Sequence, residues 1–152
     1  MTWEPTRKQL EFINSDNFEK HFESVGVADG KTEALIMLPI YRGFIKHVEF
    51  RGIILRRYYH SVQDETIPRT TLLYLPLGAI YNRDKVSWRF PSGAVVYLNY
   101  LTHIEDVNKY VSTRFHYIAF DNLKEFHREQ YRRMIQLCRT LNENLPSMVR
   151  TT

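Results

Sequence analysis

The sequence predicts an α/β fold in which helices flank a central, mainly parallel sheet that carries one inserted β-hairpin. Strand-like runs alternate with stretches of helical periodicity along the chain, and this order is typical of parallel strands joined by crossover helices. Two runs of alternating polarity, residues 86–90 and 94–100, flank the turn-forming Pro91-Ser92-Gly93 and predict the hairpin. A glycine-containing loop, residues 25–32, directly precedes a helix-forming apolar stretch.

The length and composition of the chain are those of one globular domain, residues 1–152. Of these residues 43% are hydrophobic and 25% are charged, which are ordinary values for a chain that buries its own core. No apolar run approaches the ~20 residues of a membrane span, and the first residues have no signal-peptide pattern. The single Cys138 cannot form an internal disulfide, so we expect a cytoplasmic protein without a membrane partner. A net charge of +4 permits contact with nucleic acid without requiring it.

The first third of the chain is expected to contain two strands around one helix. A short strand over residues 22–25 leads into the loop, and a helix over 31–38 follows until Pro39 ends it. Residues 52–55 form an apolar run with arginines at both ends, which predicts a buried strand with polar ends.

Beyond this strand the periodicity changes several times. The expected elements are a weakly helical stretch over 61–75 interrupted by Pro68, a short helix over 104–110, a strand over 115–120, an amphipathic helix over 123–141 and a last strand from residue 148. Strands and helices therefore continue to alternate to the end of the sequence, as a parallel sheet requires.

The loop before the first helix carries the second half of a phosphate-binding P-loop. Gly30-Lys31-Thr32 follows a strand-like segment and opens a helix, which is the place that such a loop occupies. There Lys31 would reach the outer phosphates of a nucleotide and the Thr32 hydroxyl would ligate Mg²⁺, while the helix N-terminus faces the anion. The alternative for Lys31 is a solvated lysine in a first helical turn. The motif favours a P-loop NTPase-type sheet.

The first half of this loop departs from the motif. Val25 stands where the motif has glycine, and the glycine comes one residue later, at Gly26. A left-handed backbone at a valine costs roughly 1–2 kcal/mol. Asp29 also places a negative charge in the loop, and two unit charges about 4 Å apart repel by about 4 kcal/mol at an effective dielectric of about 20. The two changes would together weaken nucleotide binding by about a hundredfold or more.

A second nucleotide signal is the aromatic-rich strand over 115–120, which ends at Asp121. An apolar strand that finishes in aspartate is the Walker B arrangement, whose carboxylate holds the Mg²⁺ water shell beside the P-loop. Taken alone, an apolar strand that ends in aspartate is a weak signal. Asp121 would then be a turn residue, or the N-cap of a helix that begins at Leu123. Its combination with Gly30-Lys31-Thr32 upstream favours the metal role.

With these motifs in this order, the chain resembles, over almost its whole length, the ATPase domain of phage terminase large subunits, the motors that package DNA into capsids. Beyond the loop itself, the resembling segments are Pro5 with Gln9-Leu10-Glu11-Phe12, residues 75–82, 88–93, 99–101, 105–110, 115–123 with Phe126 and Gln130-Tyr131, and Arg150-Thr151-Thr152.

The resemblance implies an ATPase that uses ATP and Mg²⁺ to package viral double-stranded DNA in the cytoplasm of a host cell. It implies that Gln9 reads adenine and that Thr152 belongs to a motif that couples hydrolysis to movement. The implied nucleotide-binding residues are Gln9, Gly26, Asp29, Gly30, Lys31 and Thr32, and the implied metal ligands are Thr32 and Asp121. The implied partners are DNA, a portal, a small terminase subunit and further copies of the chain in a ring.

Three departures from the family pattern leave the activity open. The family has an arginine where this chain has Val27, and a water-activating glutamate where it has Asn122. The family also continues into a nuclease domain, whereas this sequence stops at the coupling motif, at Thr152. The expectation is therefore a packaging ATPase impaired in hydrolysis. The alternatives are a non-catalytic relative that binds nucleotide, DNA or a packaging partner, and a prophage remnant.

Several polar residues have an ordinary structural alternative. Gln9 would otherwise be a surface glutamine. Arg56 and Arg57, at the end of the second predicted strand, would contact nucleotide or DNA or be solvated strand ends. The arginines of the last predicted helix are expected on its solvated face; they are Arg128, Arg132 and Arg139.

Overall fold

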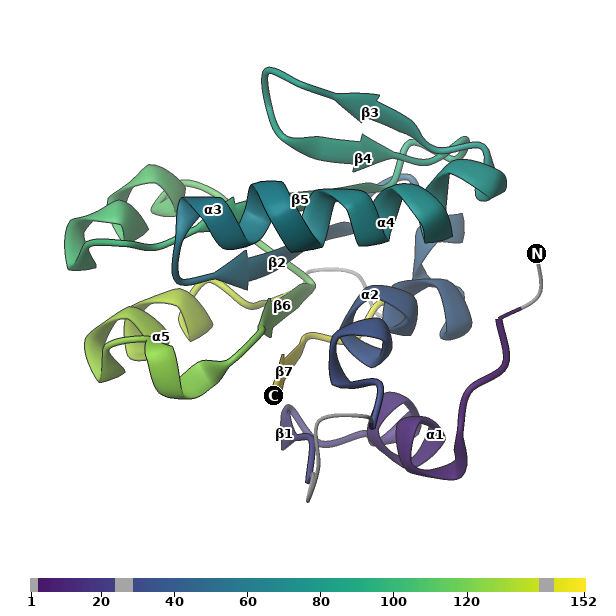
Figure 1. The fold of residues 1–152 in the computed structure, drawn as a ribbon, viewed down its shortest axis with the longest axis horizontal. Helices are drawn as coiled ribbons and strands as arrows, with labels where there is room; N and C mark the ends of the chain where they lie inside the picture. Colours follow the sequence, from purple (N-terminus) through teal and green to yellow (C-terminus); the bar gives the residue numbers. More distant parts are fainter. Residues whose placement is uncertain (1–2, 24–28, 140–143) are drawn as a thin grey trace.

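The computed structural model describes residues 3–23, 29–139 and 144–152 of the chain. Its strands are β1 (Glu19–His21), β2 (Arg51–Arg56), β3 (Ile80–Asn82), β4 (Ser87–Arg89), β5 (Val95–Tyr100), β6 (Tyr117–Phe120) and β7 (Met148–Thr151). They form one seven-stranded sheet in the order β1-β7-β6-β2-β5-β4-β3 (Figure 1). The first five strands of this order are parallel, and β4 and β3 continue the sheet antiparallel. The predicted mainly parallel sheet with a hairpin insert is confirmed.

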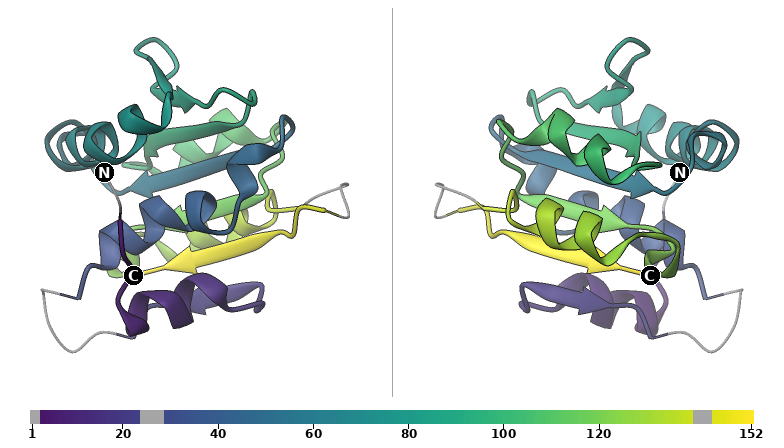
Figure 2. Two further views of the ribbon diagram at one scale, coloured as in Figure 1. Left: turned by 90° about the vertical axis from the view of Figure 1, so that its right-hand side faces the viewer. Right: turned by 90° about the vertical axis from the view of Figure 1, so that its left-hand side faces the viewer.

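Helices cover both faces of the sheet, so the central strands β2, β6 and β7 are buried on both sides. The α-helices are α1 (Arg7–Asn14), α2 (Lys31–Tyr41), α3 (Tyr59–Ser61), α4 (Ile67–Tyr74) and α5 (Arg128–Ile135). The shorter helical turns are η1 (Phe44–Lys46), the π-helix η2 (Val62–Thr66), η3 (Leu75–Leu77), η4 (Ile104–Tyr110) and η5 (Leu123–Glu125). Figure 2 views the sheet from opposite sides and shows α2 in front of it in one view and α5 in the other.

Alternate residues of the central strands enter two separate cores. Ile54 of β2 and Tyr117 of β6 pack with α1, α2 and α4, whereas Ile53 and Ile118 pack with η4 and α5. All four side chains are fully buried. This pattern explains why the strands read as continuous apolar runs, because a parallel sheet under two helical layers has no solvent face.

The strand register brings distant polar residues to one edge of the sheet. Leu55 of β2 pairs with Phe120 of β6, and Phe120 pairs in turn with Thr151 of β7. The residue that follows each of these three positions lies at the carboxyl ends of the parallel strands. These residues are Arg56, Asp121 and Thr152.

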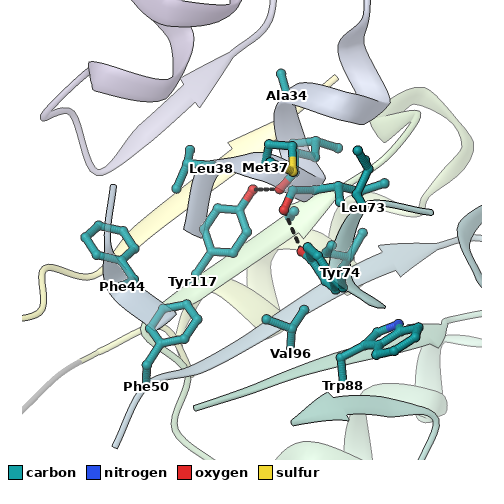
Figure 3. Packing of buried hydrophobic residues seen from close by; sticks show 14 of the residues in the cluster. Ala34, Met37, Leu38, Phe44, Phe50, Leu73, Tyr74, Trp88, Val96 and Tyr117 are labelled. Carbon is teal, nitrogen blue, oxygen red and sulfur yellow. Dashed lines mark hydrogen bonds between the residues drawn. The ribbon is translucent and has the colours of Figure 1, made fainter. Parts of the chain in front are cut away.

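The prediction that Pro39 ends the first helix is wrong. Helix α2 continues through Pro39 to Tyr41. Proline has no N–H for the carbonyl of Leu35 one turn earlier, but the Tyr117 hydroxyl donates to that oxygen over 2.7 Å. Figure 3 shows Tyr117 and, beside it, Tyr74 directed at α2. Burial raises the pKa of both phenols, so each remains a protonated donor.

Other boundaries also differ from the prediction. The single helix expected over 123–141 is interrupted after η5, because His127 has an extended backbone and its N–H donates to the buried Gln130 in a capping box. Pro68 does not interrupt its helix, since it lies in the first turn of α4 directly after the π-helix. The strand predicted over residues 22–25 is wrong at residues 22–23, because β1 ends at His21, and residues 24–25 lie outside the described residues. Strand β3 was not predicted.

A buried arginine on β7 joins the sheet to the segment between α1 and β1. Arg150 is fully buried and donates to five backbone carbonyls, at distances from 2.6 to 3.4 Å. The acceptors are Phe12, Ser15, Asn17, Phe18 and Val149. The segment between α1 and β1 is thus held by the last strand of the sheet.

Among the described residues, no helix has both the length and the apolar character needed to cross a membrane.

Candidate functional site

An open cleft of about 640 Å³ lies at the carboxyl edge of the sheet, beside the first turn of α2. Four predicted site residues line it, which are Lys31, Thr32, Asp121 and Asn122. The remaining lining residues come from β2, η2 and α4; they are Arg56, Asp64, Glu65, Pro68, Arg69 and Leu72. The register of the parallel strands and the start of α2 therefore bring the two predicted nucleotide motifs to one place.

The carboxylate of Asp121 is the centre of this site. Thr32 Oγ1 donates to its Oδ2 over 2.9 Å, and Thr152 Oγ1 donates to its Oδ1 over 2.9 Å. The Arg56 guanidinium lies 3.6 Å from the same Oδ2. Asp121 is only 4% exposed, so these contacts act in a largely dehydrated setting. The residues predicted to hold a metal and to couple hydrolysis thus meet at one side chain.

Asn122 follows Asp121 in a left-handed conformation, with φ 64° and ψ 65°. Asparagine adopts this region more readily than other residues with a side chain. Its backbone N–H donates to Thr152 Oγ1 over 2.9 Å, so that hydroxyl links two successive residues of the β6 end. The neutral amide of Asn122 can orient a water molecule but cannot accept a proton at neutral pH.

Gln9 lies beside the loop in the interior and not on the surface. It is 4% exposed, its Nε2 donates to the Gly30 carbonyl over 2.9 Å, and its Oε1 accepts from the Thr6 N–H. Asp29 is paired with Lys8, with 3.5 Å between Nζ and Oδ2. These loop residues line a second cavity of about 410 Å³ next to α1. Gly26, the remaining predicted loop residue, lies outside the described residues, as do Val25 and Val27.

Gly30 begins helix α2 in a left-handed conformation that suits glycine, with φ 69°. We expect Gly30→Ala to lower the free energy of unfolding by roughly 2–3 kcal/mol, from backbone strain and a lost hydrogen bond. A Cβ at this position would stand 2.3 Å from Gln9 Nε2 and displace the amide from the Gly30 carbonyl. Urea denaturation measures the change.

Gly43→Ala is the matched control for this substitution. Gly43 has a similar φ of 76°, but a Cβ there would meet no atom closer than 4.0 Å. It should therefore show the strain alone, roughly 1–2 kcal/mol. Equal losses for the two variants would contradict the proposed role of the Gln9 contact.

The oxygen atoms of Thr32 and Asp121 at the cleft are suited to ligate Mg²⁺. Thr32 Oγ1 and the Asp121 carboxylate are hard oxygen ligands in direct contact, at the start of a helix whose N-terminus favours anions. No group of three His, Cys, Asp or Glu side chains that could hold a metal is found in the described part of the chain. Phosphate and water oxygens would therefore complete the coordination, as is usual for Mg²⁺ in nucleotide sites.

Two residues of the cleft were missed or left open by the sequence. Arg56 is 6% exposed and is not a solvated strand end. Glu65 is paired with it, with 2.9 Å between Oε2 and the guanidinium. Nothing in the local sequence marks either residue. The parallel register of β2 and β6 places Arg56 beside Asp121, and Glu65 lies in the π-helix η2. Arg57, in contrast, donates to the Glu125 carbonyl and to Gln130 away from the cleft.

The single thiol takes no part in this site. Cys138 is 5% exposed, and burial raises its pKa to about 12. A thiol in that state is protonated at neutral pH and is a poor nucleophile.

No protein-family model matches the sequence, and no curated protein sequence does. Solved structures do match its fold. The large terminase of a thermophilic bacteriophage in complex with ADP has a TM-score of 0.71 at 13% identity, over 97% of this chain and 38% of the terminase. The same terminase in complex with ATP-gamma-S has a TM-score of 0.64, also at 13% identity, over 97% of this chain and 37% of the terminase.

The large terminase ATPase domain of Thermus phage P74-26 has a TM-score of 0.63 at 10% identity, over 99% of this chain and 65% of that domain. This chain therefore spans about two fifths of a whole large terminase and about two thirds of an isolated ATPase domain. At these identities the likeness concerns the fold. The chain has the fold of a phage large terminase ATPase domain.

Proposed function

We propose that this chain is a terminase-type ATPase domain that binds ATP with Mg²⁺ at the cleft and hydrolyses it poorly. The observation that supports this most directly is the contact of Thr32 and Thr152 with the two oxygens of Asp121. This arrangement joins the start of α2, the end of β6 and the end of β7. Terminase structures of the same fold contain ADP or ATP-gamma-S, which supports a nucleotide as the ligand.

Several residues in and beside the cleft have a role in this proposal. Lys31 would bind the outer phosphates from the first turn of α2, and Thr32 with Asp121 would hold Mg²⁺. When bound, the metal would neutralise charge on the phosphates. Thr152 would transmit changes at Asp121 to β7. Its hydroxyl contacts Asp121 and the Asn122 N–H, and the residue directly follows β7. Gln9 would read the adenine base, and its hydrogen bond to the Gly30 carbonyl holds it beside the loop.

The proposed partners follow from the terminase fold. They are double-stranded DNA as the packaged substrate, a portal and a small terminase subunit, with further copies of the chain in a ring. The expected location is the cytoplasm of the host cell. The second candidate function is a non-catalytic domain that binds nucleotide, DNA or a packaging protein. Asn122 favours this candidate, because the residue that directly follows Asp121 carries an amide in place of a carboxylate.

The proposal is tested by the affinity of the chain for Mg²⁺-ATP. We expect weak binding that Lys31→Ala weakens further by roughly 10- to 100-fold, the loss typical of one hydrogen bond to a charged group. Isothermal titration calorimetry measures both affinities. The matched control is Lys85→Ala in the exposed hairpin turn, which should leave the affinity unchanged. Equal affinities for the unmodified chain and Lys31→Ala would contradict the proposal.

A further inference from the structure

Arg56 is a buried cation at the edge of the proposed nucleotide site. It ends β2, directly beside Asp121 at the end of β6, and only 6% of it is exposed. The only other buried arginine among the described residues is Arg150, on β7. The two therefore allow a direct comparison of how the fold satisfies a buried guanidinium.

The two arginines differ in their partners. Each of the three nitrogens of Arg150 donates to a backbone carbonyl. Arg56 instead faces two carboxylates, Glu65 at 2.9 Å and Asp121 at 3.6 Å. Its Nε is buried and has no hydrogen-bond partner in the described part of the chain. The fold alone satisfies Arg150, whereas Arg56 retains donor capacity for a further acceptor.

The position of this donor capacity indicates the kind of acceptor. Arg56 lines the same cleft as Lys31 and Thr32, and it approaches the same Asp121 oxygen as the Thr32 hydroxyl. A guanidinium presents its N–H groups in a planar fork that matches phosphate oxygens. A buried charge with unmatched donors is costly, and an incoming phosphate would supply the missing acceptors.

We propose that Arg56 binds the terminal phosphate of the nucleotide, so that the site distinguishes a triphosphate from a diphosphate. This assignment rests on the proposed nucleotide-binding function. Arg56 reaches Asp121 from β2, on the side of β6 opposite to β7 and β1. The inner phosphates would lie at the N-terminus of α2, and the outermost would extend toward this side of Asp121. Glu65 positions the guanidinium until the phosphate arrives.

The test compares the affinities for Mg²⁺-ATP and Mg²⁺-ADP by calorimetry. Arg56→Gln should weaken ATP binding roughly 10- to 100-fold while changing ADP binding by less than about threefold, because only ATP carries the contacted phosphate. Retained ADP binding shows that the variant is folded. Arg56→Lys keeps the charge but loses the fork, and it should also reduce the preference for ATP over ADP, by a smaller factor. If Arg56→Gln does not fold, Arg56→Lys carries the test.

Arg69→Gln is the matched control. Arg69 lines the same cleft and carries the same charge, but it is half-exposed and paired with Glu33 at 3.1 Å. It should leave the ATP-to-ADP ratio unchanged. The assignment is overturned if the ratio stays constant in both Arg56 variants, or if Arg69→Gln lowers it as much as Arg56→Gln does. An unmodified chain that binds neither nucleotide would instead overturn the proposed function, and with it this assignment.

Discussion

The unmodified chain is expected to hydrolyse ATP at a rate barely above the uncatalysed background. In the proposed function Asn122 takes the position where a carboxylate would activate water, and its amide accepts no proton. The absence of a general base typically lowers a rate by about 10²–10⁴-fold. Steady-state phosphate release with Mg²⁺-ATP measures this rate. Robust ATP hydrolysis by the unmodified chain would contradict this expectation and would instead support a working packaging motor.

Introducing a carboxylate alone, by Asn122→Glu, should raise the rate of ATP hydrolysis only slightly. Asn122 has φ 64°, and most other side chains adopt that region at a cost of roughly 1–2 kcal/mol, so Asn122→Glu begins with a strained backbone. The combination with Val25→Gly, Val27→Arg and Asp29→Ser should raise the rate more than any of the four changes alone, since groups that act on one transition state are not additive. A single substitution that matches the fourfold variant would contradict this expectation.

Arg150→Met is expected to lower the free energy of unfolding by about 3 kcal/mol. Methionine fills much of the same volume, but five carbonyls in α1, in the α1–β1 connection and on β7 would lose the Arg150 donor. Two of them keep a second donor, the Val149 N–H at the Phe18 carbonyl and the Arg42 guanidinium at the Ser15 carbonyl. Each buried acceptor left unsatisfied costs roughly 1–3 kcal/mol, and the five losses do not add fully. For a chain of this size the melting temperature should fall by about 10 °C. Urea denaturation and a thermal melt both measure the loss.

The control for this substitution is Arg83→Met in the exposed hairpin turn, where a surface change is usually within about 0.5 kcal/mol. An Arg150→Met variant as stable as the control would show that water replaces the lost donors. The carbonyl network would then contribute little to stability.

The features that the sequence predicted well are those with a local signal. Gly30-Lys31-Thr32 sets the start of α2 through the left-handed glycine, and the apolar run before Asp121 sets the end of β6. The alternating runs around Pro91-Ser92-Gly93 set the antiparallel pair of β4 and β5. In each case neighbouring residues determine the element, so a short window contains the necessary information.

The features that it did not predict depend on residues far apart in the chain. Pro39 remains helical because Tyr117, 82 residues from Leu35, donates to the carbonyl that the proline leaves free. Arg56 is buried because the register of β2 and β6 places it between two carboxylates. No local pattern reports a tertiary donor or a strand register, so these outcomes required the assembled sheet.

The place of β7 in the sheet has a consequence for how the chain folds during its synthesis. Strand β7 lies between β1 and β6, although it is the last of the strands in the sequence. Until residues 148–151 leave the ribosome, β1 lacks its partner β7, and Arg150 cannot hold the segment that follows α1. Contacts between residues so distant in sequence form late and slowly. Because Thr152 is synthesised after β2, β5 and β6, its link to Asp121 would be among the last to form, once these strands have paired.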